Sequence, residues 1–244
     1  MWQFLRERLV DSLTDLIFPL TCFVCSAPID SQPDSHAVCP ACRTLVLDDP
    51  LESCPRCAGT VGPFSVTENG CAKCGDNAFK FDRAFRLGPY DGLLKDVILR
   101  MKVAAGEPLA ETVGFLWAAS QAEAFRECRC DAVVPVPLHW RKRISRGYNP
   151  ASALARAIAA ELRVPYLDAL KRTRNTPSQT GLSATERRTN VKGAFSVSRR
   201  GLAQSLRVIL VDDVMTTGST CSAAAHALKA DGAAQVIAAV LAHR

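Results

Sequence analysis

The feature that most limits how this chain can fold is a short apolar run that leads directly into two acids and a turn of small residues. The run, at 208–211, reads Val-Ile-Leu-Val and is typical of a strand buried on both faces of a parallel sheet. Asp212 and Asp213 follow it, and an Ala-rich helical stretch covers 221–229. The turn between the acids and the helix contains Thr216, Thr217, Gly218, Ser219 and Thr220. Because backbone N–H groups and the positive end of a helix dipole converge at such a turn, the stretch predicts a phosphate-binding loop.

The residues around this turn narrow the kind of phosphate ligand. No lysine follows Gly218, so the stretch is not the G-x-x-x-x-G-K-[ST] loop of nucleoside triphosphatases. The acidic pair stands where the hydroxyls of a ribose would lie if its 5-phosphate occupied the turn. Strand, acids and turn together resemble the phosphoribosyl-pyrophosphate (PRPP) signature of type I phosphoribosyltransferases. The alternative is an ordinary strand-turn-helix, in which thirteen consecutive positions would agree with that signature by accident.

Eight of the eleven cysteines form four C-x-x-C pairs. Thirteen residues separate the first two pairs, and thirteen separate the last two. Since each pair supplies two thiolates from a tight turn, two pairs can close one tetrahedral zinc site. Taken in sequence, the ligand sets are Cys22, Cys25, Cys39 and Cys42 for one ion, and Cys54, Cys57, Cys71 and Cys74 for the other. Interleaved ligation, in which the first pair joins the third and the second joins the fourth, is the alternative.

Four thiolates leave no open coordination position, so we expect both zinc ions to be structural. The region has few large apolar residues, and metal ligation would contribute on the order of 10 kcal/mol per site to its folding. An amphipathic helix is predicted before the first pair, with apolar side chains at mostly helical spacing: Phe4, Leu5, Leu9, Leu13, Leu16 and Ile17. The other three cysteines, Cys128, Cys130 and Cys221, are expected to be small semi-buried residues.

Hydropathy and charge restrict the class of protein further. The N-terminus carries charges every few residues, unlike a signal peptide, and no stretch approaches the roughly 18 apolar residues of a membrane span. We therefore expect a cytoplasmic chain, in which paired cysteines bind metal before they form disulfides. The net charge of +6 is uneven, because residues 141–200 carry fourteen basic and three acidic side chains. Such a segment suits a polyanionic ligand, PRPP or nucleic acid, and a solvated charged face is the alternative.

From about residue 81 onward, apolar strands alternate with helical stretches. The predicted strands are 81–90, 131–136, 167–170, 207–211 and 235–241, and the predicted helices are 93–101, 107–125, 150–162 and 221–229. The alternation predicts an α/β fold with a parallel sheet covered on both faces, and a ligand site beyond the carboxyl ends of the strands. We expect the N-terminal helix and double zinc ribbon to occupy 1–78 and the α/β domain to occupy 79–244.

Two more segments are predicted to reach this edge of the sheet. The stretch 134–149 begins at a strand end with Pro135, Val136 and Pro137. Its basic side chains suit a pyrophosphate, and they are Arg141, Lys142, Arg143 and Arg146. The stretch 175–195 is polar at its start and then basic, which is the character of a mobile lid; a surface loop with a charged helix is the alternative.

These segments, in this order behind the paired cysteines, resemble the ComF family, including its ComFC-like members. That family joins a double zinc ribbon to a type I phosphoribosyltransferase domain and is linked to DNA uptake in competence. The resemblance covers nearly the whole chain. Its matching elements are the four C-x-x-C pairs, 134–137, Arg146, Gly147, Tyr148, Asn149, Gln179, Leu182, Arg187, Asn190, Phe195 and the Asp-Asp turn. Pro150 departs from a common glutamine and Tyr148 from a frequent phenylalanine, which puts any contact of that glutamine in doubt.

The resemblance implies a role for each segment. Asp212 and Asp213 would bind the ribose hydroxyls and stabilise positive charge at the anomeric carbon, and 216–220 would hold the 5-phosphate. Pyrophosphate, with Mg²⁺ bridging its oxygens, would be held by Pro135, Val136, Pro137, Arg141, Lys142 and Arg143. Single-stranded DNA would be contacted by Arg141, Arg143, Arg146, Arg187 and Arg188. Trp140 and Tyr148 could stack on bases, but core packing is the more frequent fate of such side chains. A competence helicase would be a further partner.

Three functions are compatible with these residues. The chain could be a PRPP-binding factor of DNA uptake and natural transformation that contacts single-stranded DNA. It could instead be an active phosphoribosyltransferase that transfers ribose 5-phosphate to an unidentified acceptor in nucleotide metabolism, or a regulatory protein that only senses a ligand. No general base stands out in the sequence, so neither the acceptor nor turnover is predicted. The first function is the one we expect.

Overall fold

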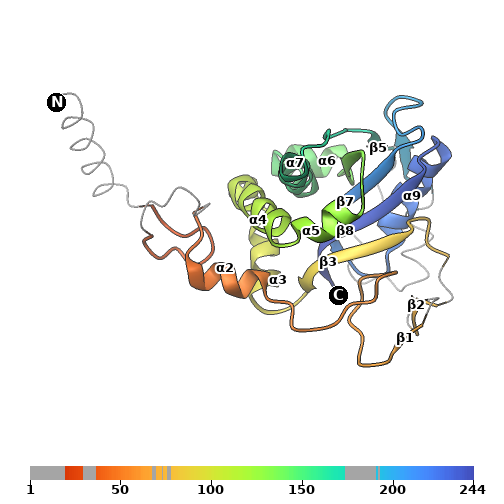
Figure 1. Ribbon diagram of the computed structural model, residues 1–244. Helices are drawn as coiled ribbons and strands as arrows, with labels where there is room; N and C mark the ends of the chain where they lie inside the picture. The colour runs from red at the N-terminus through yellow and green to blue at the C-terminus, as the bar shows by residue number, and fades with distance from the viewer. Residues whose placement is uncertain are drawn as a thin grey trace, which may run out of the picture. The chain divides into compact units, whose positions relative to one another are not determined.

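The computed structural model describes residues 20–29, 37–67, 70–72, 74–75, 78–173, 191 and 193–244 (Figure 1). The chain forms two compact units, Met1–Val46 and Leu47–Arg244. The first pair of C-x-x-C motifs lies in the first unit, and the second pair lies in the larger unit. The expected boundary after residue 78 stays a prediction, and the expected N-terminal amphipathic helix lies outside the described residues.

The larger unit is built on a four-stranded sheet in which every neighbouring pair is parallel. Its strands are β3 (Arg83–Pro89), β4 (Ala132–Pro135), β7 (Arg207–Met215) and β8 (Gln235–His243). They lie in the order β3-β8-β7-β4, so β7 is an interior strand between β8 and β4. The predicted parallel sheet is confirmed, and the long connections that parallel strands require are helical (Figure 1).

Helices flank this sheet. They are α3 (Gly92–Arg100), α4 (Glu107–Ser120) after the 3-10 turn η1 (Ala104–Gly106), α5 (Ala122–Glu127), α7 (Pro150–Leu162) and α9 (Ser219–Ala230). Val208 and Leu210 of β7 pack in one cluster with Leu228 of α9. Because successive side chains of a strand point to opposite faces, the equally buried Ile209 and Val211 face the side on which α7 packs. In the part of the chain that the structure describes, no helix combines the length and apolar character needed to cross a membrane.

The helix predicted over 107–125 is interrupted at Gln121, which has φ −114° and ψ 23°. The Gln121 side chain explains the interruption, since it accepts a hydrogen bond from Trp117 Nε1 (3.0 Å) and donates one to the carbonyl of Arg86 (3.0 Å). The side chain therefore fixes α4 to strand β3 where the helical axis changes. The apolar periodicity continues across the break, so the sequence pattern alone gives no sign of it.

Several short elements were not predicted. The segment 134–149 contains a helix, α6 (Trp140–Arg146), which buries no side chain and therefore has no apolar periodicity. The predicted strand at 167–170 lies two to three residues later, as β5 (Leu170–Arg172), and pairs antiparallel with β6 (Phe195–Val197). Near the cysteines lie α2 (Pro40–Leu47) and the antiparallel pair β1 (Val66–Thr67) and β2 (Gly70–Cys71).

One buried arginine anchors residues 49–60 to the sheet. Arg86 of β3 is 3% exposed, and its guanidinium donates to both carboxylate oxygens of Asp49, at 2.9 and 3.1 Å. It also donates to the Thr60 hydroxyl and to the carbonyls of Leu51 and Ala58, at 2.6, 3.2 and 3.3 Å. These five bonds match the five donors of the guanidinium, so the charge is fully compensated below the surface. Arg86 thereby attaches the residues around the third C-x-x-C pair, Cys54 and Cys57, to the α/β domain.

Replacing Arg86 by methionine is expected to lower the free energy of unfolding by about 3 kcal/mol, because Asp49 and the carbonyl groups lose their donors. Chemical denaturation followed by circular dichroism measures the loss. Arg126→Met is the matched control, since Arg126 pairs with Glu161 at 3.1 Å on an exposed surface and should contribute less than about 1 kcal/mol. Equal losses in the two variants would contradict the anchoring role of Arg86.

Candidate functional site

The site begins where β7 extends beyond the end of β4, one of its two neighbouring strands. The ladder between β4 and β7 ends at the pair Pro135 and Val211, while β7 continues beside β8 as far as Met215. Residues 212–215 therefore have β8 as their one strand neighbour and lie at the carboxyl edge of the sheet, beyond the end of β4. This is the edge at which open α/β sheets bind ligands.

The acidic pair lies in this extended part of β7 and not in the turn after it. Asp213 points toward Lys102, which follows α3, and the carboxylate and ammonium groups form an ion pair of 3.1 Å. Asp212 accepts a hydrogen bond from the backbone N–H of Asp213 at 2.9 Å, and its other oxygen lies 4.0 Å from Sγ of Cys221 in α9. Because successive side chains of a strand point to opposite faces, Asp212 lies near Cys221 of α9 and Asp213 lies on the other face, toward Lys102.

Cations from three other elements surround the two acids. Burial and the charge of Asp213 raise the pKa of Asp212 to about 7, while the Asp213 N–H and the charges of Lys102 and Arg172 act in the opposite direction. Loss of hydration and the positive charges of Arg172 and Arg146 lower the pKa of Lys142, and Asp213 opposes that change. Lys142 was predicted from the sequence, whereas Lys102 and Arg172 were missed. They lie in segments whose spacing carries no motif, so only their position in the fold identifies them.

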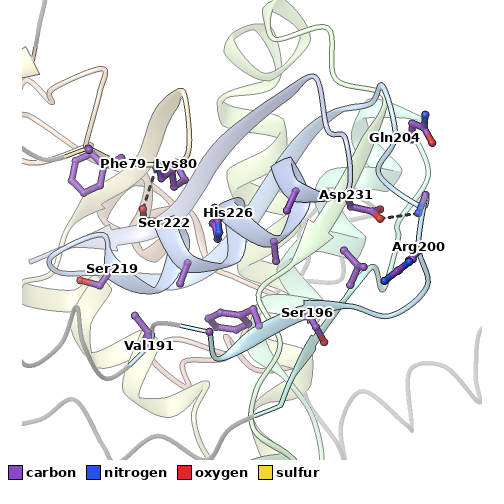
Figure 2. A pocket seen from close by; sticks show the side chains of 18 of the residues that line it. Phe79, Lys80, Val191, Ser196, Arg200, Gln204, Ser219, Ser222, His226 and Asp231 are labelled. Carbon is purple, nitrogen blue, oxygen red and sulfur yellow. Dashed lines mark hydrogen bonds between the residues drawn. The ribbon is translucent and has the colours of Figure 1, made fainter.

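The predicted phosphate loop, residues 216–220, leads into α9. Gly218 is the N-cap residue of this helix and has φ +70°, a left-handed conformation that glycine adopts without a steric cost. The hydroxyl groups of Thr217 and Ser219 are 2.7 Å apart, which places two hydroxyl side chains at the helix N-terminus. The positive end of the helix dipole and the backbone N–H groups of the first helical turn lie at this loop, which is the arrangement that favours an anion. Ser219 lies at this end of α9 in Figure 2.

The predicted pyrophosphate segment reaches the same carboxyl edge of the sheet. Val136 donates its backbone N–H to the carbonyl of Val211 at 2.8 Å, so Pro135, Val136 and Pro137 pass directly beside the start of the acidic pair. The imidazole of His139 is buried and accepts from the N–H of Arg141 at 3.4 Å, which caps α6. Loss of hydration and the charge of Arg172 lower the pKa of His139.

The basic side chains of α6 do not all point to the acids. Arg141 lies over the ring of Trp140, 5.3 Å from its centre, and Trp140 is 57% exposed. Arg143 lines a separate cavity of about 200 Å³ together with Glu107 and Asp168. Of the three predicted pyrophosphate cations, Lys142 is therefore the one whose charge interacts with Asp213. The roles assigned to Arg141 and Arg143 stay predictions.

The stretch 147–149, directly after α6, serves the fold. Gly147 has φ +83° and ends α6, and Asn149 caps α7 by accepting from the N–H of Ala151. The Asn149 amide also donates to the Val136 carbonyl at 3.0 Å, which holds the pyrophosphate segment in place. Tyr148 is buried, its hydroxyl donates to the carbonyl of Met101, and burial raises its pKa to about 12. Tyr148 therefore packs in the core and does not offer a stacking surface. Core packing is thus the one of the two expected fates that the structure shows for Tyr148.

Most of the predicted lid, 175–195, lies outside the described residues. Residues 174–190 and 192, which include Arg187 and Arg188, lie outside the described residues. Phe195, at the end of this segment, begins β6, and the guanidinium of Arg172 lies over its ring at 5.5 Å. Arg172 therefore connects the end of the predicted lid with the acidic pair.

The paired cysteines form two compact clusters. The first cysteine cluster is Cys22, Cys25, Cys39 and Cys42, and the second cysteine cluster is Cys54, Cys57, Cys71 and Cys74. Within each cluster all four sulfur atoms lie within 4.8 Å of one another, and the measured pairs are 3.7–3.8 Å apart. A tetrahedral ion with metal–sulfur bonds of about 2.3 Å requires sulfur–sulfur distances of about 3.8 Å. The residues fit a metal ion, and the grouping is the sequential one.

The sequence and the structure of this chain are similar to those of known proteins. The family model described as "Phosphoribosyl transferase domain" matches residues 145–244. Competence protein F of Haemophilus influenzae is 30% identical over 206 residues, which are 82% of this chain and 88% of that protein. The DNA utilization protein YhgH of Escherichia coli (strain K12) is 28% identical over 225 residues, 91% of this chain and 96% of that protein. Glutamine PRPP amidotransferase from B. subtilis, solved with ADP and GMP, matches at 21% identity and a TM-score of 0.32 over 51% of this chain and 26% of that chain.

Fold and site together define a phosphoribosyltransferase-type α/β domain joined to two four-cysteine clusters. The similarity to competence protein F extends over most of both chains. The chain belongs to the ComF family.

The raised pKa of Asp212 predicts a pH dependence of stability. A carboxyl group whose pKa is higher in the folded protein than in the unfolded chain, where it is about 4, favours folding in its protonated form. Its contribution is therefore lost as the pH rises toward and through about 7. Asp212→Asn should gain stability relative to the wild type between pH 5.5 and pH 8, as measured by denaturant unfolding at about these two pH values. Asp96→Asn, at an exposed position of α3, controls for the loss of one negative charge; an equal gain in this variant would contradict the assignment.

Proposed function

We propose that the carboxyl end of β7, together with the loop 216–220, binds PRPP. The observation that carries this proposal is the direct passage from the Asp212–Asp213 pair into a hydroxyl-lined helix N-terminus. A ribose with phosphate at one end and pyrophosphate at the other has hydroxyls for the two carboxylates and an anion for the helix N-terminus. The second anionic group would meet the cations that surround the acids, Lys102, Lys142 and Arg172.

Each segment then has a chemical task. Residues 216–220 would donate backbone N–H and hydroxyl groups to the 5-phosphate. Asp212 and Asp213 would accept hydrogen bonds from the ribose hydroxyls and stabilise positive charge at the anomeric carbon. The segment from Pro135 to Lys142 would border the pyrophosphate, which binds proteins as a complex with Mg²⁺. We infer binding from these features; transfer of ribose 5-phosphate to an acceptor is the alternative function.

Calorimetric titration with PRPP and Mg²⁺ tests the proposed binding. Saturable binding is expected below millimolar PRPP, and Asp212→Asn combined with Asp213→Asn should weaken it about tenfold or more, since charged hydrogen-bond acceptors become neutral amides. Asp91→Asn combined with Asp96→Asn removes the same charge from exposed positions near α3 and should leave the affinity unchanged. A metal-loaded wild-type protein that ignores millimolar PRPP would disprove the proposal. A screen for pyrophosphate release with candidate acceptors, on the same samples, then separates binding alone from turnover.

A role in DNA uptake is favoured by α6 and by the relatives. The relatives are named competence protein F and DNA utilization protein YhgH. In this chain α6 buries no side chain, and Trp140 and Ile144 are 57% and 74% exposed beside three basic residues. An exposed aromatic ring between guanidinium and ammonium groups is the combination with which proteins hold single-stranded nucleic acid. We infer that α6 contacts single-stranded DNA during natural transformation.

Binding of a fluorescent single-stranded oligonucleotide at several salt concentrations tests the role of α6. Arg141→Ala combined with Arg143→Ala should weaken binding and reduce the slope of log affinity against log salt by about 1.4, which corresponds to two lost phosphate contacts. Arg199→Ala combined with Arg200→Ala removes two exposed arginines from the same basic region and is the control. Equal effects of the two double variants would show that only the overall charge matters.

We further propose that both cysteine clusters bind zinc. Four thiolates at tetrahedral spacing are the ligand set of structural zinc sites, and no ligand position is left open for catalysis. Zinc would supply folding free energy and neutralise thiolate charge in both clusters. Thiolate clusters of this kind persist where thiols are kept reduced, which supports a cytoplasmic location.

A further inference from the structure

One aromatic side chain lies between the second cysteine cluster and the phosphate loop. Phe79 packs against the four sulfur-bearing residues of the cluster. On another side its ring contacts Gly218, since a Cβ atom built on Gly218 would lie only 2.8 Å from Cε1 of Phe79. The ring also stacks on Phe81, with 4.7 Å between ring centres. The same side chain therefore touches a metal-ligand cluster and the residue that begins α9.

The backbone next to Phe79 is also attached to α9. The N–H of Lys80 donates to the Ser222 hydroxyl, one turn into the helix, at 3.1 Å (Figure 2). Only four residues separate Phe79 from Cys74, the last ligand of the second cysteine cluster. A displacement of the cluster would therefore be passed along a short segment to both Gly218 and Ser222.

The position of the ring depends on the cluster because its remaining side is not packed. Phe79 and Lys80 form part of the wall of a cavity of about 1270 Å³ that extends along α9 to Asp231 (Figure 2). Among the described residues, this side of the ring faces the cavity and not a packed side chain. The cluster, Phe81 and Gly218 itself hold it in place.

We propose that Phe79 is a positioning residue that couples metal binding at the second cysteine cluster to the conformation of the phosphate loop. A bound ion would hold together four thiolates, which would otherwise repel one another, and would keep the cluster in place as the surface against which Phe79 packs. The ring then blocks movement of Gly218, whose left-handed backbone aims the N–H groups of the loop. The coupling concerns loop conformation, and its consequence for ligand affinity rests on the proposed PRPP site.

Hydrogen exchange without any ligand tests the coupling directly. Cys54→Ser combined with Cys57→Ser removes metal from the second cluster, and Cys22→Ser combined with Cys25→Ser removes it from the first, which belongs to the other unit. Mass spectrometry of intact chains should find two zinc ions in the wild type and one in each variant. Amides of 214–221 should exchange about tenfold faster in the second-cluster variant and at the wild-type rate in the first-cluster variant. Equal rates in all three proteins, or equal acceleration in both variants, would overturn the proposal.

Variants of Phe79 keep the proposal testable if loss of the second ion unfolds the domain. Phe79→Ala should retain both zinc ions and the slow exchange of 207–211 in β7, yet accelerate exchange of 214–221 about tenfold, and Phe79→Leu should restore much of the protection. Added to the second-cluster variant, Phe79→Ala should have little further effect, because both changes break one connection. Wild-type exchange in Phe79→Ala would overturn the coupling.

Ligand binding gives a second measurement. Ribose 5-phosphate should bind about tenfold more weakly to Phe79→Ala than to the wild type, and with wild-type affinity to Phe79→Leu. If the wild type binds neither this sugar phosphate nor PRPP, the proposed PRPP site fails, while the exchange rates still decide whether Phe79 couples cluster and loop. Faster exchange with unchanged affinity would show that the loop does not hold the 5-phosphate.

Discussion

The unequal length of the strands beside β7 is the constraint on which the site depends. β4 ends opposite Val211, and β8 accompanies β7 to Met215. Residues 212–215 are therefore held in the sheet by β8 on one side and have no strand beside them on the other. Had β4 continued, the two carboxylates would have been enclosed between strands and helices, where unpaired charges are costly. The end of one strand thus decides where polar chemistry can exist in a sheet whose interior is apolar.

Two acidic and three basic side chains lie near the end of β7. Asp213 is paired with Lys102, and Arg172 and Lys142 contribute positive charge from β5 and α6. Burial still raises the pKa of Asp212 to about 7, so its carboxyl group is only partly ionised near neutral pH. In the proposed complex, the sugar hydroxyls would meet the acids and the anionic groups would meet the cations.

The two cysteine clusters have the same spacing but different surroundings. The first belongs to the small unit, and the second lies in the larger unit, where Arg86 attaches the neighbouring residues to β3. The four cysteines of the second cluster form a buried group of their own, and Phe79 packs against both this group and the core of the α/β domain. The proposed coupling through Phe79 would let metal binding at these cysteines influence the loop at 216–220.

The sequence by itself determined what is local: the strand, acids, turn and helix around 208–220, the metal-ligand turns, and the alternation that gives a parallel sheet. These features follow from side-chain periodicity and turn chemistry over a few residues. It did not determine that α6 is a helix, because a helix that buries nothing has no apolar period. Only the tertiary structure brought Lys102, Arg172 and Phe79 to the site. Each comes from a segment more than thirty residues from β7, and the crossover connections of a parallel sheet, not spacing along the chain, decide which segments meet.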